Sequence, residues 1–200
     1  MEWNRTFADI QGHWAQTAIE RMAARQIADG MTEADFAPEA TLTRAQFAAL
    51  LTRSLRIHTG TGDFPFHDVP QDAWYREAVS KALAAGLVSG VSDTEFAPEQ
   101  SITREQMAVM LMNAYAYARA HDYANGTATG PESTAWDTPS RFNDGADISR
   151  WALEAVKRAV GNGLLEGNPD GTFGPRSQAT RAQAITVLSR LLDRLDQGFL

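Results

Sequence analysis

The stretch that decides the fold is Leu42–Leu55, LTRAQFAALLTRSL, which recurs as ITREQMAVMLMNAY at 102–115 and as ATRAQAITVLSRLL at 179–192. Each copy opens on Thr-Arg-x-Gln, the form of a capping box, in which Thr and Gln side chains satisfy free amides at a helix start. Apolar side chains then recur at three- and four-residue spacing, as on the buried face of a helix. The sequence therefore predicts three capped amphipathic helices. The capping role falls to Thr43 and Gln46, Thr103 and Gln106, and Thr180 and Gln183.

Each capped helix ends a longer repeat whose landmarks keep constant offsets from a tryptophan. The three origins are Trp14, Trp74 and Trp151. In every copy a glycine follows at +16, Phe-x-Pro at +22 and Thr-Arg at +29, and a Phe-x-Asp sequence precedes the tryptophan. The glycines are Gly30, Gly90 and Gly167, and the acids are Asp9, Asp68 and Asp144. Self-similarity at fixed spacing indicates a repeat architecture.

Within a repeat, an earlier helix is predicted to precede the capped one. In the first copy Trp14, Ala18 and Met22 share one helical face, which predicts a helix from about residue 14 to about residue 25. Gly86 and Gly163 stand where this helix would end in the other copies, and glycine there suits a left-handed C-cap. The first copy has Gln26, a poorer residue for that conformation.

The domain prediction is one all-α module spanning 1–200. The repeats are placed at 7–57, 66–115 and 142–195, with a turn-rich linker at 116–141. Helical repeats of this size bury too little apolar surface alone, so they are expected to pack on one another. The apolar stripes predict that the three Thr-Arg helices converge in a central three-helix core, although an open stack is also compatible with the pattern.

Composition excludes several classes of protein. Among 200 residues there is no cysteine, so disulfides, thiolate metal sites and cysteine nucleophiles are excluded. A net charge of −7 disfavours nucleic acid, whose affinity comes mostly from phosphate neutralisation. No apolar run is long enough for a membrane span. The first residues lack a basic region followed by an apolar stretch, so no signal peptide is predicted there.

The arginine of each Thr-Arg pair is not explained by capping. Arg44, Arg104 and Arg181 stand at the first helical position, where the helix dipole favours an acid. Two interpretations remain open. The guanidinium and the free helix amides could form an anion receptor, which is the interpretation favoured here, or the arginine could pair with the Phe-x-Asp acid.

The tryptophans are equally ambiguous. A tryptophan at the start of an amphipathic helix is more often a core residue than a ligand platform. Its apolar face and its N–H donor also suit stacking on a sugar. Tryptophan, arginine and aspartate recurring together indicate a carbohydrate groove.

Together these motifs resemble the S-layer homology repeats of bacterial surface proteins, over nearly the whole chain. The resemblance implies a pseudo-threefold bundle with binding grooves between neighbouring repeats. It assigns ligand binding to Arg44, Arg104, Arg181, Trp14, Trp74, Trp151, Asp9, Asp68, Asp144, Gly30, Gly90 and Gly167. One departure is that the frequent glutamate of the family's motif is Gln46, Gln106 or Gln183 here, which still completes a capping box.

The function that the resemblance implies is non-catalytic anchoring of a surface protein at the cell wall or S-layer, outside the cell. The implied partner is an anionic secondary cell wall polymer bearing pyruvate ketals on N-acetylmannosamine, together with cargo domains of the parent protein. A protein-interaction or self-assembly scaffold of the envelope is the alternative. No cofactor or metal is expected: Asn168-x-Asp170-Gly171 is only a fragment of a calcium loop, and the four histidines do not recur at one repeat position.

Overall fold

The computed structural model describes residues 6–58, 60, 63–124 and 141–197. Its elements are the α-helices α1 (Gln16–Ala24), α2 (Arg44–Ser54), α3 (Arg76–Ala84), α4 (Arg104–Ala124), α5 (Leu153–Gly161) and α6 (Arg181–Gln197), with short 3-10 helices at Ala8–Ile10 and Gly145–Asp147. No strand forms within these described ranges. The fold is all-α, as the sequence predicts.

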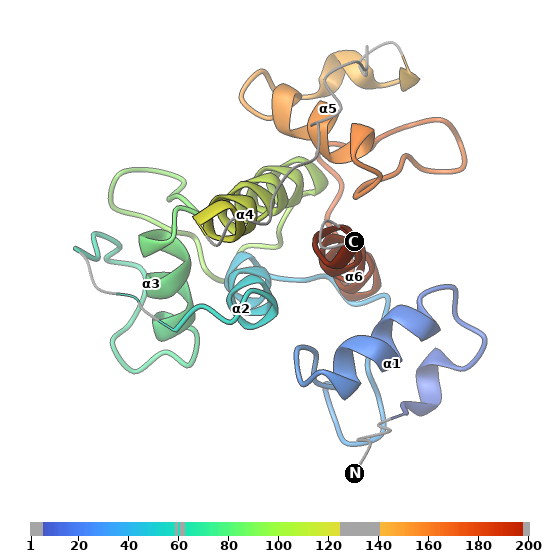
Figure 1. Ribbon diagram of the computed structural model, residues 1–200, viewed down its shortest axis with the longest axis horizontal. Helices are drawn as coiled ribbons and strands as arrows, with labels where there is room; N and C mark the ends of the chain where they lie inside the picture. Colours follow the sequence, from blue (N-terminus) through green and yellow to red (C-terminus); the bar gives the residue numbers. More distant parts are fainter. Residues whose placement is uncertain (1–5, 59, 61–62, 125–140, 198–200) are drawn as a thin grey trace.

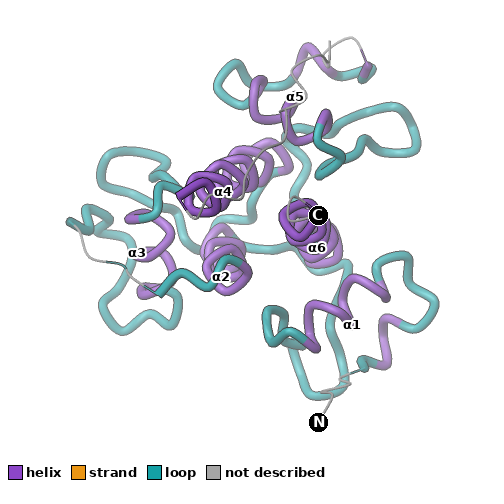
Figure 2. The backbone as a smooth tube through the Cα atoms, in the orientation of Figure 1, coloured by secondary structure: helices purple, strands orange, loops and turns teal. Residues whose placement is uncertain are grey.

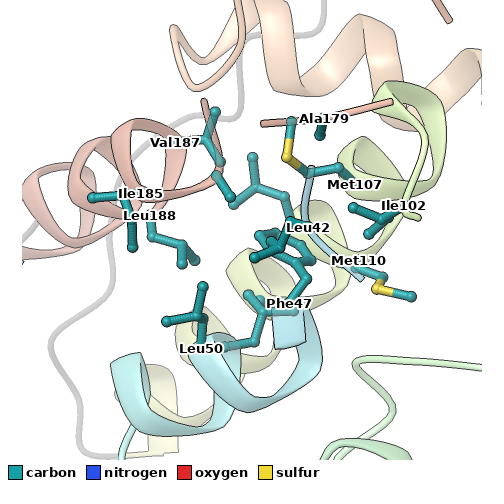
Figure 3. Packing of buried hydrophobic residues seen from close by; sticks show 14 of the residues in the cluster. Leu42, Phe47, Leu50, Ile102, Met107, Met110, Ala179, Ile185, Val187 and Leu188 are labelled. Atoms are coloured by element: carbon teal, nitrogen blue, oxygen red, sulfur yellow. The ribbon is translucent and has the colours of Figure 1, made fainter. Parts of the chain in front are cut away.

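The three Thr-Arg helices, α2, α4 and α6, occupy the centre of the molecule, and α1, α3 and α5 lie around them (Figures 1 and 2). Their apolar faces meet in one buried cluster. Figure 3 shows Phe47 of α2, Met107 of α4 and Leu188 of α6 in this cluster, and none of these side chains is exposed. Because the repeats share this core, the closed arrangement holds and the open stack is wrong.

A ring of backbone hydrogen bonds joins the repeats just before the central helices. The amide of Leu42 donates to the carbonyl of Ala179, that of Ala179 to Ile102, and that of Ile102 back to Leu42, at 3.1, 2.9 and 2.8 Å. The three residues occupy the same repeat position, so the ring has pseudo-threefold symmetry. It fixes the directions in which the three helices leave the centre.

Each outer helix packs on the central helix of the preceding repeat. α3 lies against α2 and α5 against α4, and α1 lies against α6, which closes the circle (Figure 1). A surface between repeats is therefore built from one central helix and the first helix of the next repeat.

Element boundaries differ from the sequence prediction in two places. The outer helices begin two residues after the tryptophan, because the residues before them form a turn. In the first repeat this turn is closed by a hydrogen bond from the Gln16 amide to the His13 carbonyl at 2.9 Å. Helix α4 continues to Ala124, so residues 116–124 are helical where the sequence suggested a linker. The rest of the proposed flexible stretch, 125–140, lies outside the described residues.

The predicted left-handed positions after the outer helices are confirmed. Gly86 and Gly163 have φ of +69° and +70°, and Gln26 adopts the same conformation at +58°. A side chain with a Cβ is strained there, so the first repeat keeps an unfavourable residue at this turn.

One acid ties the third repeat to the second. Glu105, buried in the first turn of α4, accepts hydrogen bonds from the amide and the hydroxyl of Ser149, both at 2.9 Å. The other two repeats have Ala45 and Ala182 at this position. Glu105 is thus specific to the junction that follows the long insertion.

Candidate binding grooves

Thr and Gln form reciprocal hydrogen bonds at the start of each central helix. In α2 the amide of Gln46 donates to Thr43 Oγ1 at 3.2 Å, and the amide of Thr43 donates to Gln46 Oε1 at 2.9 Å. The same two bonds join Thr103 with Gln106 and Thr180 with Gln183. The motif arginine is therefore held at the first position of a rigid helix end.

Each motif arginine reaches into the loop of a different repeat. Arg44 Nε donates to the carbonyl of Phe96 at 2.9 Å, and its Nη2 donates to that of Ser89 at 3.0 Å. Its guanidinium carbon lies 4.8 Å from the centre of the Phe96 ring, a cation–π arrangement. Arg44 is 4% exposed, so these contacts replace solvent almost completely.

The other two arginines repeat this geometry. Arg104 donates to Phe173 and Glu166 carbonyls at 2.7 and 2.8 Å, and Arg181 donates to Phe36 and Asp29 carbonyls at 2.9 and 2.7 Å. Burial lowers the pKa of all three guanidinium groups, and nearby carboxylates partly oppose that effect. No bond to Nη1 of these arginines is made by the described residues.

This geometry gives the arginines a structural role that neither interpretation contains, and it leaves their binding of an anion as a prediction. They fasten one repeat to another through backbone carbonyls, and no described hydrogen bond joins them to the Phe-x-Asp acids. The acids lie nearby, since Asp68, Asp144 and Asp9 exert attraction on Arg44, Arg104 and Arg181 respectively. In each case the acid belongs to a different repeat from its arginine.

The Phe-x-Asp acids hold the loop that the arginine also contacts. Asp9 accepts hydrogen bonds from the amides of Phe36 and Ala37 at 2.8 and 2.6 Å. Partial burial raises the pKa of Asp9, but these amides and the charge of Arg181 outweigh it and leave that pKa below its usual value. The amides of Phe96 and Ala97 bind Asp68 in the same way, and those of Phe173 and Gly174 bind Asp144.

The glycines permit a close approach of backbone and ring. A Cβ on Gly30 would lie 2.5 Å from the Phe7 ring, and one on Gly90 would lie 2.6 Å from the Phe66 ring. Gly167 meets the Phe142 ring in the same way. Any larger residue would displace the loop from its phenylalanine.

The three tryptophans are exposed, so the interpretation of them as core residues is wrong. Trp14 and Trp74 are 62% exposed and Trp151 is 59% exposed. An exposed indole in a concave setting is free to stack on an apolar sugar face.

Two of the tryptophans line grooves built by all three repeats. The α2 groove, a cavity of about 170 Å³, is lined by Gly30, Gln46, Leu50 and Arg53 of the first repeat, Trp74 of the second and Arg181 of the third. The α6 groove, of about 400 Å³, is lined by Gly167, Gln183, Val187 and Arg190 of the third repeat, Trp14 of the first and Arg104 of the second. The Phe-x-Asp acids Asp9, Asp68 and Asp144 line neither groove, whereas Asp29 lines the α2 groove.

By the pseudo-threefold relation, the equivalent positions of a third groove belong to Trp151, Arg44, Gly90 and α4. These residues fill the same repeat positions, but the chemistry differs on the central helix. Where the first two grooves have Arg53 and Arg190, α4 has Asn113.

A charged pair accompanies the second arginine of each groove. Arg53 bonds to Asp29 at 3.1 Å, and Arg190 bonds to Glu166 at 2.9 Å. In the second repeat the equivalent pair is neutral. Ser89 stands in place of the acid, and Asn113 stands in place of the arginine and donates to the Leu87 carbonyl at 3.3 Å. Arg53 and Arg190 are not among the residues predicted from the sequence, although both stand at +39 from a tryptophan and that shared offset could have revealed them.

Three interlocked helix–loop–helix repeats with grooves between them define a class of helical repeat module. This chain belongs to the S-layer homology domain family, whose model matches residues 6–48, 65–108 and 141–185. Domains of this family anchor proteins to the bacterial cell wall and are not catalytic. Within the described residues no helix has both the length and the apolar character needed to cross a membrane.

Relatives that share this segment include an enzyme and two proteins named for the surface layer or for cellulosome anchoring. An amylopullulanase of Thermoanaerobacterium thermosulfurigenes is 36% identical over 193 residues. The match covers 96% of this chain and 10% of the amylopullulanase. The chain is 30% identical, over 95% of its length, to 15% of the surface-layer 125 kDa protein of Lysinibacillus sphaericus. It is 25% identical, over 80% of its length, to 34% of a cellulosome-anchoring protein of Acetivibrio thermocellus. The chain thus spans at most about a third of these relatives, and the enzyme name belongs to a protein of which it matches a tenth.

Proposed function

We propose that this chain anchors a surface protein to the cell wall by binding an anionic secondary wall polymer in the α2 and α6 grooves. The observation that carries the proposal is the convergence of a tryptophan, a glycine and a motif arginine from three different repeats in each groove. Such a site exists only in the closed ring, so its assembly is coupled to folding.

The chemistry of each groove suits a sugar that carries a carboxylate. The exposed indole offers a stacking face, and Gln46 or Gln183 lines the same groove. The motif arginine uses Nε and Nη2 within the protein, which leaves Nη1 to donate to a ligand oxygen. A pyruvate ketal on N-acetylmannosamine supplies both features, an apolar ring face and a carboxylate.

The electrostatic attraction of an anionic polymer must come from positive charges within the grooves, because the chain as a whole has a net charge of −7. The motif arginine provides it, Arg181 in the α2 groove and Arg104 in the α6 groove. The charges of Arg53 and Arg190 are balanced by their acidic partners. Two grooves on one module add avidity toward a wall that presents many polymer ends, even if each end is bound weakly.

A scaffold function is the alternative and would require an apolar docking face. Among the described residues the large exposed apolar side chains are the three tryptophans, Met31 and Val91. Two of these tryptophans belong to grooves that also contain arginines, which favours a polar glycan over an apolar protein surface.

The test is co-sedimentation with purified wall sacculi before and after chemical removal of the polymer. We expect the wild-type protein to sediment only with sacculi that retain polymer, and the Trp14→Ala/Trp74→Ala variant to stay in solution. Both side chains are exposed, so the variant should melt like wild type and serve as its own folding control. Equal sedimentation with stripped sacculi, or undiminished binding by the folded double variant, would overturn the proposal.

A further inference from the structure

A basic chamber adjoins the α2 groove at the packing surface between α2 and α3. It has a volume of about 500 Å³, and its charged walls are Arg25, Arg53, Arg56, Lys81 and Glu77, with His58 beside them. Trp74, Ala49 and Arg53 line both spaces. The chamber and the groove therefore lie on either side of shared walls that include the tryptophan.

Several of these cations already have acidic partners. Lys81 bonds to Glu77, Arg53 bonds to Asp29 at 3.1 Å, and Arg25 lies 3.7 Å from Asp196. No carboxylate of the described residues lies within ion-pair distance of Arg56. Arg56 is exposed, and it brings an uncompensated charge into a space that already holds Lys81.

Comparison with the equivalent packing surface shows that this charge is not a requirement of the fold. Arg56 and Lys81 stand at +42 and +7 of their repeats. At the α6–α1 surface the same positions hold Asp193 and Arg21, which form an ion pair at 2.5 Å. At the α4–α5 surface the +42 position is Ala116. Only the surface beside the α2 groove sets two cations at these positions.

The backbone at Arg56 adds a second, independent observation. Its φ is +50°, in the left-handed region just past the end of α2. Glycine or asparagine is the favoured residue there, and any other L-residue is strained. A cation near a helix C-terminus gains from the dipole, but Arg53 in the last turn already supplies that. A strained, unpaired and exposed arginine is typical of a functional position.

We propose that the basic chamber is a second anion subsite, which binds a phosphate or carboxylate on the polymer a short distance from the group held in the α2 groove. This inference rests on the proposed function for the identity of the polymer. It goes beyond it by making the α2 groove longer than the α6 groove, with Trp74 between two anion-binding ends. Arg56 and Lys81 are the groups that contact the second anion.

The experiment uses the indole N–H signals of Trp74 and Trp14 by NMR, with inorganic phosphate and pyruvate as separate probes at constant ionic strength. We expect saturable shifts of the Trp74 signal with at least one probe. Arg56→Asp, which reproduces the acid–base arrangement of the α6–α1 surface, should weaken that binding at least tenfold while leaving the response of Trp14 unchanged. Arg56→Asn removes the charge with a residue suited to the left-handed backbone, and it should show the same loss.

Arg176→Asp is the matched control, because it makes the same charge change at an exposed arginine that lines none of the three cavities. It should leave the affinity at Trp74 within twofold of wild type. Equal affinity of Arg56→Asp and wild type, or an equal loss in Arg56→Asp and Arg176→Asp, would overturn the subsite.

Polymer fragments then identify the source of the anion. Removal of phosphate groups, or separately reduction of carboxylates, should abolish the difference between wild type and Arg56→Asp in one arm only. Polymer binding that is equal in wild type and Arg56→Asp overturns the subsite and leaves the proposed function standing. Phosphate binding at Trp74 without any polymer binding by wild type overturns the proposed function and leaves the chamber as an anion site.

Discussion

Arg181 and Phe36 are 145 positions apart in the chain, yet Arg181 Nε donates to the Phe36 carbonyl at 2.9 Å while its guanidinium carbon lies 4.4 Å from the centre of the Phe36 ring. This contact joins the third repeat to the first, and its two equivalents join first to second and second to third. The motif arginines therefore close the ring and also form walls of the grooves. If the proposed function holds, stability and ligand binding both depend on Arg104 and Arg181.

Replacing a motif arginine should destabilise the protein itself. Arg44→Ala removes two hydrogen bonds to backbone carbonyls and the contact with the Phe96 ring from a buried site. We expect a loss of about 3 kcal/mol in the free energy of unfolding, since bonds that involve a charged partner contribute about 1.5–3 kcal/mol each. Arg44→Lys should recover only part of it, because an ammonium cannot reproduce the planar fork.

Urea unfolding followed by circular dichroism measures this loss, with Arg176→Ala as an exposed control. An Arg44→Ala protein as stable as wild type would restore the interpretation of the arginine as an anion receptor without a structural role.

The strained turn of the first repeat offers a stabilising change. Gln26 has φ of +58° where the other repeats have glycine. Gln26→Gly should raise the free energy of unfolding by about 0.5 kcal/mol, because relief of about 1–2 kcal/mol of left-handed strain exceeds the entropy cost of glycine. Gly86→Gln, the reverse change at the equivalent turn, should lower it by a similar amount. Thermal melts of the two variants moving in the same direction would contradict this reasoning.

The carboxylate of Asp9 should make stability depend on pH. Its pKa is lowered in the folded protein, so its contribution is present above the pKa of the unfolded chain and is lost as the pH falls through the folded pKa. Asp9→Asn should cost about 1 kcal/mol near pH 7, where the charged acceptor is present, and progressively less below about pH 4. Unfolding midpoints of both proteins from pH 7 to pH 3 test the sign. A difference that is constant with pH would show that the charge is not involved.

The buried Glu105 should control docking of the third repeat. Glu105→Ala leaves the amide and hydroxyl of Ser149 without their acceptor. We expect hydrogen exchange in α5 to accelerate more than in α3, because only the third repeat depends on this bond. Ala45→Gly, at the equivalent position of α2, is the control for disturbing a helix start. Uniform acceleration in α3 and α5 would mean that Glu105 supports the whole core instead.

Features that are encoded within one repeat could be predicted from the sequence, whereas contacts between repeats could not. The capped helices and their shared core follow from Thr-Arg-x-Gln and the apolar stripes, because local hydrogen bonds and helical periodicity are written within one repeat. The partners of Arg44 and Trp74 could not be deduced in this way, since both contacts cross between repeats and repetition gives no order in space. The exposure of the tryptophans was also beyond reach, because an indole at a helix start suits core and surface equally. Arg53 and Arg190 were missed because only two of three repeats carry them.

The most direct test of the groove assignment is the stoichiometry of polymer binding, measured by isothermal titration with short fragments that each carry one terminal sugar. We expect two ends to bind per wild-type chain, one in the α2 groove and one in the α6 groove. Trp74→Ala or Trp14→Ala should each leave one site, and the double variant should leave none. Two sites that persist in the folded double variant would contradict the account.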